Sequence, residues 1–484
     1  MEEPSSSTTN TERGNGGPIN LPDELMRFIE RDTYSLLIKG FAGTGKTTLA
    51  LTILKTLGSK NNFFYISTRI SPKQLFQYYP WLSKFVGLPK PSNRGEGQEC
   101  NLSPSFEDAR LDEPESLFER ITNQLMDIAS PIIIIDSWDA IASFMDKEAR
   151  LNNERVLQTW RERAGAKLIF ISEHPDDTTL DFLVDGIVEL KQSYIESVRV
   201  REILLLKLRG VRIERSSYIY TLDNNVFRSF APYRPIKFRP VPRRKFVVPL
   251  NDGIASADHV KSGFPALDAS LGGGFPRKGV VLLELNSHVN TTVAMAFVER
   301  MISNFVSTGN PVVFQPFDWM DPQSVMNYVA PSIPSSKRDL FKILWTGKTM
   351  TGMIAADHNI ILANKKTKKN GIPTVVALSK LRKKYHDKLL LNIMGTDLLQ
   401  KFYGQREKKN ILENMMAEMK SNADLSVVIG HSQHDVLEYL SEAADIHLRL
   451  LMISDTLFLQ SLVPTTTLYA VVPSRHQITL EPVV

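Results

Sequence analysis

Short apolar runs alternate along the chain with longer segments in which apolar residues recur every three or four positions. This alternation predicts parallel strands joined by helices, because a continuous apolar run such as Pro131–Ile135 is typical of a strand buried on both faces. In the first half the predicted strands are 35–39, 63–67, 131–135, 167–172, 198–207 and 217–222, and the predicted helices are 47–57 and 114–128. The last two strands predict a closing hairpin or meander. Residues 88–108, rich in Pro, Gly, Ser and Asn, predict an inserted loop.

The same alternation returns in the second half, and one phrase recurs. Leu183–Leu190 and Ala443–Leu450 each follow an apolar strand and a short helix, and each carries Asp at its third position. Predicted elements of the second half are strands 279–285, 311–315, 388–394 and 426–429 and helix 292–304. The pattern therefore predicts two tandem α/β domains with mainly parallel central sheets.

The predicted boundaries follow changes in composition. Residues 228–245 contain seven cations, four prolines and no acid, which predicts a stiff linker. The predicted parts are a flexible tail at 1–20, a first domain at 21–230, a basic Pro-rich linker at 231–258 and a second domain at 259–484.

The segment Gly40-Phe-Ala-Gly43-Thr-Gly45-Lys46-Thr47 matches the Walker A pattern between a predicted strand and a predicted helix. Its glycines let backbone N–H groups surround a phosphate, and a lysine and a hydroxyl then serve the terminal phosphates and Mg²⁺. The predicted cofactors are ATP and Mg²⁺, with Thr47 and Asp136 as metal ligands; Asp136 ends the apolar strand that follows. The predicted nucleotide-binding residues are Gly40, Phe41, Ala42, Gly43, Thr44, Gly45, Lys46, Thr47 and Thr48.

Several short motifs extend this pattern into a resemblance to a known family. Asp136-Ser137, Ile171-Ser172-Glu173, Asp185-Gly186 and Lys207-Leu-Arg209-Gly210 follow in an order that resembles KaiC-like members of the RecA superfamily. The stretches 66–72 and 112–119 are similar to the archaeal gas-vesicle regulators of the GvpD type. The resemblance implies a RecA/KaiC-like fold, an archaeal source and a regulatory role.

The resemblance also implies roles for two cations and raises a doubt about hydrolysis. In KaiC-like proteins the Lys-x-Arg pair reaches the ATP of a neighbouring subunit, so Lys207 and Arg209 are candidate trans catalytic residues of a homo-oligomer. Where those ATPases carry paired glutamates, this chain has Arg69 and Ile70. Glu173, or Asp139, could replace the missing base. We therefore expect Lys46, Asp136 and Glu173 to support at most a weak ATPase.

The second half reads as a degenerate copy of the first. Ser262–Pro276 resembles the lead-in to a KaiC P-loop, but the loop that follows, Leu285–Thr292, has no glycine, and Asn290 is assigned to the lysine position. The companion strand ends in Gly395-Thr396 instead of a carboxylate, and the late strand 456–462 has no Lys-x-Arg. Three losses at equivalent places predict a pseudo-ATPase domain.

Composition narrows the class of protein. The chain of 484 residues has a net charge of +5, a single cysteine, Cys100, no apolar run of membrane-spanning length and no basic-apolar start of a signal peptide. These features predict a cytoplasmic protein without a membrane anchor.

Three functions are compatible with the sequence. The leading hypothesis is an ATP-binding regulator in which nucleotide controls oligomer or partner state. The alternatives are a DNA-associated RecA-like recombination or repair ATPase, and a scaffold with vestigial nucleotide binding. The basic clusters 365–388 and 228–245 could bind nucleic acid or form solvated faces.

Overall fold

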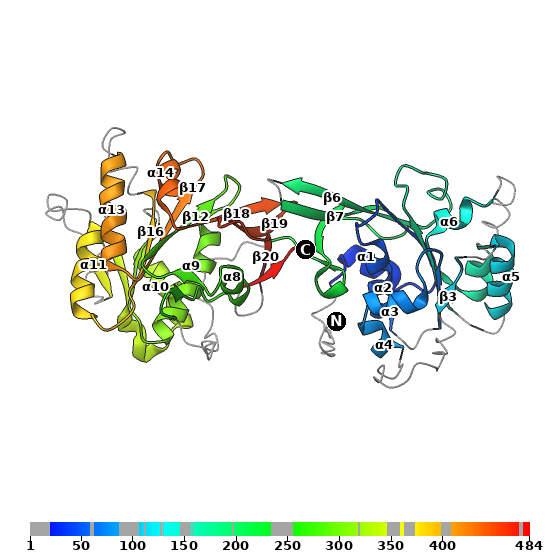
Figure 1. Ribbon diagram of the computed structural model, residues 1–484, viewed down its shortest axis with the longest axis horizontal. Coiled ribbons are helices and arrows are strands. Elements are labelled where there is room, and N and C mark those ends of the chain that lie inside the picture. The colour runs from blue at the N-terminus through cyan, green and yellow to red at the C-terminus, as the bar shows by residue number, and fades with distance from the viewer. Residues whose placement is uncertain are drawn as a thin grey trace, which may run out of the picture. The chain divides into compact units, whose positions relative to one another are not determined.

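The computed structural model divides the chain into two compact units, residues 1–231 with Val484 and residues 232–483. It describes residues 20–58, 62–86, 106–110, 113–125, 128, 130–145, 156–157, 159–195, 198–233, 255–317, 320–345, 359–362, 373–397, 408–473 and 478–484. Each unit is considered by itself below (Figure 1).

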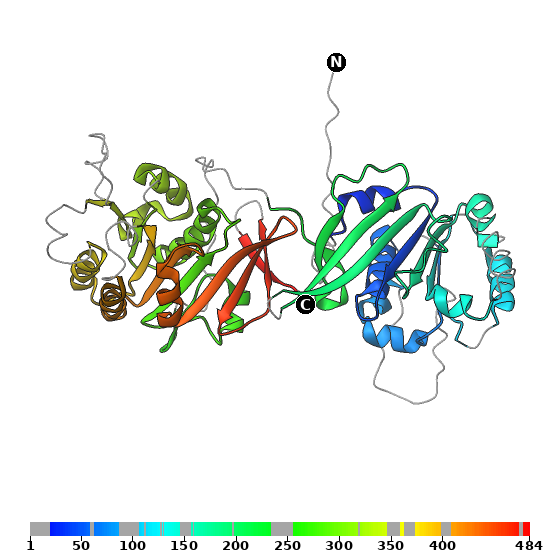
Figure 2. The same ribbon diagram turned by 90° about the horizontal axis from the view of Figure 1, so that it is seen from above.

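Among the described residues, unit 1 is built on a nine-stranded sheet of order β3-β2-β4-β5-β1-β6-β7-β8-β9. Strands β3 to β6 in this order are parallel, and β7 to β9 complete the sheet in antiparallel fashion. The strands are β1 (Tyr34–Gly40), β2 (Phe63–Ser67), β3 (Phe106–Asp108), β4 (Ile132–Asp136), β5 (Lys167–Ser172), β6 (Gly186–Ile195), β7 (Val198–Leu208), β8 (Ser217–Thr221) and β9 (Arg228–Ser229). The long β6–β7 hairpin is green in Figure 2.

Helices cover both faces of this sheet. The helices are α1 (Asp23–Ile29), α2 (Lys46–Leu57), α3 (Pro72–Tyr78), α4 (Trp81–Phe85), α5 (Pro114–Leu125) and α6 (Trp138–Ala142). Helices α2 to α4 lie on one side of the strands and α5 on the other (Figure 1). Ile132 and Ile134 point into the core beneath the first group, and Ile133 and Ile135 point into the core on the opposite face. An uninterrupted isoleucine run suits β4 because both of its faces are dry.

The predicted loop at 88–108 is wrong at its end. Residues Phe106–Asp108 form β3, an edge strand that pairs in parallel with β2, with Tyr65 opposite Phe106. A three-residue strand is too short for periodicity to reveal, and only pairing with β2 defines it. The preceding residues 87–105 lie outside the described part of the chain.

Unit 2 repeats this architecture. Its described strands include a ten-stranded sheet of order β15-β14-β13-β16-β17-β12-β18-β19-β20-β21, in which β15 to β18 are parallel. The strands are β10 (His259–Val260), β11 (Phe275–Pro276), β12 (Gly279–Leu285), β13 (Val312–Gln315), β14 (Phe341–Trp345), β15 (Ile360–Leu362), β16 (Leu391–Gly395), β17 (Leu425–His431), β18 (Ile446–Ile453), β19 (Thr456–Val463), β20 (Tyr469–Pro473) and β21 (Ile478–Pro482). The helices are α8 (Pro265–Ser270), α9 (Thr291–Ser307), α10 (Pro322–Val329), α11 (Pro373–Lys384), α13 (Lys408–Asn422) and α14 (Val436–Ala443).

The repeated segments Leu183–Leu190 and Ala443–Leu450 make the same contact in both units: their Asp binds the backbone of the central strand. Asp185 accepts a hydrogen bond from the backbone N–H of Ser35, and Asp445 accepts one from the N–H of Val280, at 3.1 and 2.8 Å. Ser35 and Val280 lie near the start of β1 and β12, the central strands of the two sheets. Two mainly parallel α/β sheets in tandem confirm the predicted fold class.

Several predictions concern residues outside the described ranges. These are the tail at 1–19, Cys100, most of the proposed linker (234–254) and the lysines at 365–369. Within the described ranges, no helix is long and apolar enough to cross a bilayer.

The close packing of α1 on β6 gives a first test. A Cβ at Gly186 would lie 2.7 Å from Cζ of Phe28 and 3.0 Å from Cδ1 of Leu36. Gly186→Ala is therefore expected to destabilise unit 1 by about 1–3 kcal/mol through overpacking. Hydrogen exchange of the β1 and β6 amides measures this locally. Gln192→Ala, at an exposed position of β6, should change protection by less than about 0.5 kcal/mol; equal effects of the two changes would contradict the packing argument.

Candidate nucleotide site

The Walker A segment connects the central strand β1 to helix α2, as the motif requires. Gly40, Gly43 and Gly45 all have positive φ angles, of 154°, 81° and 94°. A Cβ at Gly40 would lie 2.6 Å from the backbone oxygen of Leu190, and a Cβ at Gly45 would lie 2.6 Å from Leu222, whereas nothing lies within 4 Å of one at Gly43. The loop is therefore packed closely against the protein at Gly40 and Gly45 and is open at Gly43.

The start of α2 offers unsatisfied donors to an anion. Gly45 is its N-cap residue and has no side chain, so the cap residue accepts no side-chain hydrogen bond from the first turn. Phe41, Ala42 and Gly43 are exposed at the outer rim of the loop, and Phe41 is 65% exposed. The N–H groups at a helix N-terminus form an anion site, because the helix dipole places partial positive charge there.

Lys46 is already held inside this loop. Its side chain is buried, and Nζ donates a hydrogen bond to the backbone oxygen of Phe41 at 3.0 Å. Burial lowers the pKa of Lys46 below its usual value, while the carboxylates of Glu173 and Asp136 partly offset this effect. A cation that has lost water in this way gains from a nearby phosphate.

Asp136 and Thr47 meet at the carboxyl ends of the strands. Thr47 Oγ1 donates to Oδ2 of Asp136 at 2.7 Å, and the Tyr65 hydroxyl donates to the same oxygen at 2.5 Å. Burial, and then the Asp136 charge, raise the pKa of Tyr65 well above its usual value, so its proton stays in this hydrogen bond. A hydroxyl and a carboxylate in contact fit a Mg²⁺ ion whose other ligands are water and phosphate oxygens.

Sequence reasoning missed the tyrosines that support the site. Besides Tyr65, the hydroxyl of Tyr79 shares a hydrogen bond with Thr48 at 2.8 Å, and that of Tyr220 donates to the backbone oxygen of Thr44 at 2.5 Å. Tyr220 is fully buried on β8, far from the motif in sequence. The one available signal was a tyrosine inside the apolar strand Phe63–Ser67.

Arg69 occupies the position at which the resemblance predicted glutamate, and it faces the candidate base. Its Nη1 lies 2.6 Å from Oε2 of Glu173, and the two side chains are 51% and 24% exposed. Asp139 accepts hydrogen bonds from the N–H of Glu173 at 2.5 Å and from the hydroxyl of Ser172 at 3.1 Å. Both candidate bases thus already have partners: Glu173 pairs with the Arg69 guanidinium, and Asp139 accepts hydrogen bonds from the end of β5 and the residue after it.

Lys207 and Arg209 lie at the other end of the strands. Lys207 pairs in register with Ile187 and Arg209 follows β7, whereas the P-loop side of β1 pairs with Leu190. Lys207 Nζ donates to the backbone oxygens of Asp181 and Val184 at 2.8 and 2.7 Å, so its ammonium already closes a turn. Arg209 is 58% exposed and contacts Asp185 at 3.3 Å. Neither residue joins the Walker A segment of its own chain.

In unit 2 a side chain of the equivalent loop, that of Asn290, caps the helix that follows. Residues 41–45 separate β1 from α2 and residues 286–290 separate β12 from α9, so the two loops have equal length. Thr291 therefore replaces Lys46, and the assignment of Asn290 to the lysine position is wrong by one residue. Asn290 replaces Gly45 and caps α9 by accepting a hydrogen bond from the N–H of Thr292 at 3.0 Å.

The metal carboxylate of unit 2 is replaced by an aromatic ring. Gly395 ends β16 at the place of Asp136, and a Cβ there would lie 2.8 Å from Cδ1 of the buried Phe317. Phe314 takes the place of Tyr65 by register, so the supporting hydroxyl is also lost. The described residues of this loop and strand offer neither a lysine nor a carboxylate at these places.

Some of the described cations of the 365–388 cluster already have partners within the protein. Arg382 donates to the backbone oxygens of Asn422 and Lys388 and pairs with Asp424. Lys384 lies over the ring of Tyr385. Arg382 therefore serves packing, whereas Lys380 and Lys383 are exposed on α11.

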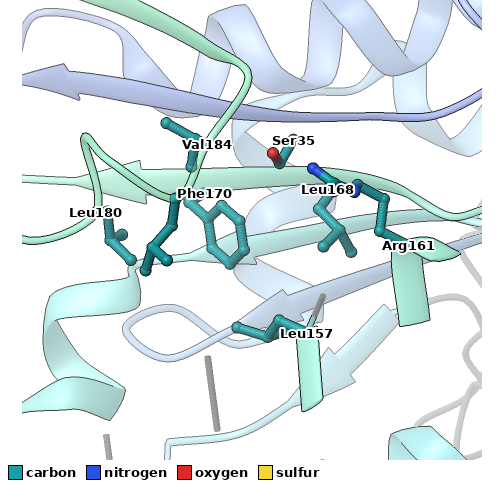
Figure 3. A pocket seen from close by; sticks show the side chains of 8 residues that line it. Ser35, Leu157, Arg161, Leu168, Phe170, Leu180 and Val184 are labelled. Carbon is teal, nitrogen blue, oxygen red and sulfur yellow. The ribbon is translucent and has the colours of Figure 1, made fainter. Parts of the chain in front are cut away.

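A separate pocket lies on the opposite end of β1 from the phosphate loop (Figure 3). Leu157, Leu168, Phe170, Leu180, Leu183 and Val184 give it an apolar lining, and Ser35 and Arg161 supply its polar groups. Arg161 is already paired with Asp185 at 2.8 Å. The pocket contains no residue of the Walker A segment.

The part of the chain that holds the phosphate loop is similar to known proteins. Residues 25–208 match the family model described as "GvpD gas vesicle protein, P-loop domain". Protein GvpD2 of Halobacterium salinarum is 28% identical over 314 residues, which are 62% of this chain and 62% of the relative. Protein GvpD1 of the same organism is 28% identical over 60% of this chain and 55% of the relative. The chain thus matches about three fifths of the length of these relatives.

More distant similarity extends to circadian clock proteins. Circadian clock oscillator protein KaiC of Parathermosynechococcus lividus is 24% identical over 281 residues, 54% of this chain and 48% of that protein. Residues 25–208 of unit 1 are thus similar to the GvpD P-loop domain, and about half of the chain is similar to KaiC.

The cap of α9 can be tested directly. Asn290→Ala should destabilise unit 2 by about 1 kcal/mol, because it leaves the N–H of Thr292 without its side-chain acceptor, whereas Asn290→Gly should cost only a few tenths. Hydrogen exchange at the first turn of α9 is the measurement. Unchanged protection in Asn290→Ala would show that the side chain does not close this loop.

Proposed function

We propose that this protein is an ATP-binding regulator: unit 1 binds Mg-ATP, hydrolyses it slowly, and thereby controls its oligomeric or partner-binding state. The observation that carries the proposal is the uncapped start of α2 with Lys46 held beside it. In this assignment Lys46 and the loop N–H groups hold the phosphates, and Thr47 and Asp136 hold Mg²⁺, the carboxylate through water. The bound nucleotide supplies a transferable terminal phosphate.

Slow turnover follows from the state of the candidate bases. Arg69 stands where KaiC-like ATPases carry a glutamate, and a guanidinium cannot accept a proton from water; the nearby Glu173 follows a different strand, β5. Asp139 already accepts from the main chain of Glu173, which keeps it in a positioning role. A nucleotide that persists is better suited to a switch than to a motor.

Control of assembly follows from the placement of Arg209. This guanidinium lies away from its own phosphate loop and is more than half exposed, so it can reach a nucleotide bound by a second copy of the chain. Lys207 would have to leave two carbonyl oxygens to do the same, which makes it the weaker candidate. Fixed cations stabilise charge on a phosphoryl group in transfer.

Unit 2 then serves as a pseudo-ATPase domain, a scaffold or partner surface without nucleotide. Asn290 already accepts a hydrogen bond from the first turn of α9, and Phe317 fills the space beside Gly395. The cluster of exposed lysines on α11 would allow an anionic partner, a regulatory protein included.

Calorimetry with Mg-ATP tests the nucleotide site. Lys46→Ala should weaken binding by about a hundredfold or more, because it removes a buried, charge-assisted phosphate contact. Wild-type turnover should stay below about 1 s⁻¹, at the low end of enzyme rates. Lys55→Ala, on the same helix but over Trp81, is the matched control and should bind normally. Turnover of many per second that Lys46→Ala abolishes would contradict slow hydrolysis.

Sizing by light scattering tests control of assembly. Mg-ATP should increase the mass of the wild-type protein, and Arg209→Ala should remove this increase without weakening ATP binding, because the residue acts on another subunit's nucleotide. Arg212→Ala, at an exposed position of the same connection between β7 and β8, should keep the increase. A mass that does not respond to Mg-ATP would favour a scaffold with vestigial binding.

A further inference from the structure

The backbone of Arg69 is fixed at the phosphate edge of the sheet. The preceding Thr68 N–H donates to the backbone oxygen of Asp136 at 2.8 Å, and the Ser67 hydroxyl donates to the backbone oxygen of Ile70 at 2.6 Å. These bonds hold the turn on both sides of Arg69. Its long side chain, by contrast, is half exposed and is held by one partner in the described structure, Glu173.

Glu173 is likewise anchored through its main chain. Its N–H is held by Asp139, while its carboxylate extends to Arg69. Because both side chains are partly exposed, water screens the pair, and exchange of one partner costs little. The arrangement is thus a cation and an anion on rigid supports, joined by a weak contact.

This pair lies within electrostatic reach of the phosphate-binding lysine. The Glu173 carboxylate favours the charged form of Lys46, whose pKa burial lowers, and the Arg69 guanidinium opposes it. Any change in negative charge beside Lys46 therefore acts on both members of the pair with opposite sign. A nucleoside triphosphate brings one phosphate group more to this place than a diphosphate does. That added charge repels Glu173 and attracts Arg69.

We propose that Arg69 is a sensor of the terminal phosphate, held by Glu173 until a nucleoside triphosphate binds. The incoming γ-phosphate takes the guanidinium from Glu173, because a phosphate offers Arg a bidentate, more highly charged partner than a screened carboxylate. Arg69 thus selects ATP over ADP. The inference rests on the proposed function, since it names how the same site distinguishes its two nucleotides.

The exchange also links nucleotide sensing to Glu173, the candidate base. Glu173 is released from Arg69 only when the triphosphate is in place. The turn at Ser67–Ile70, which carries Arg69, is joined to the metal-binding strand, because Thr68 donates hydrogen bonds to the backbone oxygen of Asp136. No covalent step is involved. One ion pair breaks and another forms.

Titration calorimetry with Mg-ATP and with Mg-ADP on the full chain is the test. Arg69→Ala should weaken ATP binding by about tenfold or more, the value of one charge-assisted bond, and change ADP binding by less than about twofold. Arg69→Lys should retain part of the preference for ATP over ADP, since lysine keeps the positive charge but cannot bind a phosphate in bidentate fashion. Glu173→Gln should tighten ATP binding, because it removes the competitor for Arg69. Arg110→Ala is the matched control, since Arg110, just after the edge strand β3, forms an equally short ion pair with Asp108 at 2.6 Å.

The outcomes separate the two proposals. Equal weakening of ATP and ADP by Arg69→Ala, no weakening of either, or the same loss in Arg110→Ala would overturn the sensor. A wild-type protein that binds both nucleotides through Lys46 with equal affinity would also overturn it while leaving nucleotide binding intact. A wild-type protein that binds neither nucleotide would instead overturn the proposed function.

Discussion

The unsatisfied N–H groups at the start of α2 are the constraint on which the candidate site depends. Gly45 can reach its left-handed conformation and leaves the first turn without a cap, while the buried strand β1 delivers the loop to the edge of the sheet. A helix end of this kind needs an acceptor. Water can serve, but an anion is favoured by the helix dipole and by Lys46 beside it.

Unit 2 shows what the same scaffold becomes when this requirement is met internally. Asn290 supplies an acceptor for the N–H of Thr292 from its own side chain, which α2 lacks at its cap residue. The volume next to Gly395 is filled by Phe317, whereas Asp136 in unit 1 is held by hydroxyls. Fold and site are therefore separable: the sheet, its helices and the Asp445 contact persist after the phosphate cradle is lost.

Charge at the edge of unit 1 is arranged as a chain of alternating sign. Asp136 and Glu173 lie near Lys46, and Arg69 closes the chain on the exposed side. Such a chain is sensitive to one added charge because each member already has a partner that can be exchanged. The same arrangement that favours sensing works against general base catalysis, since Arg69 occupies the place at which the resemblance predicts a glutamate base.

The sequence by itself determined the features that depend on neighbouring residues. Apolar runs defined the buried strands, glycine spacing defined the phosphate loop, and the repeated Asp185 and Asp445 phrases identified the tandem fold. Only the tertiary structure decided what depends on register and side-chain direction: β3 as an edge strand, Tyr65 on Asp136, Arg69 on Glu173, and Thr291 instead of Asn290 in the place of Lys46. These relations join residues that are distant in sequence, and pairing between strands, which no local pattern encodes, brings them together.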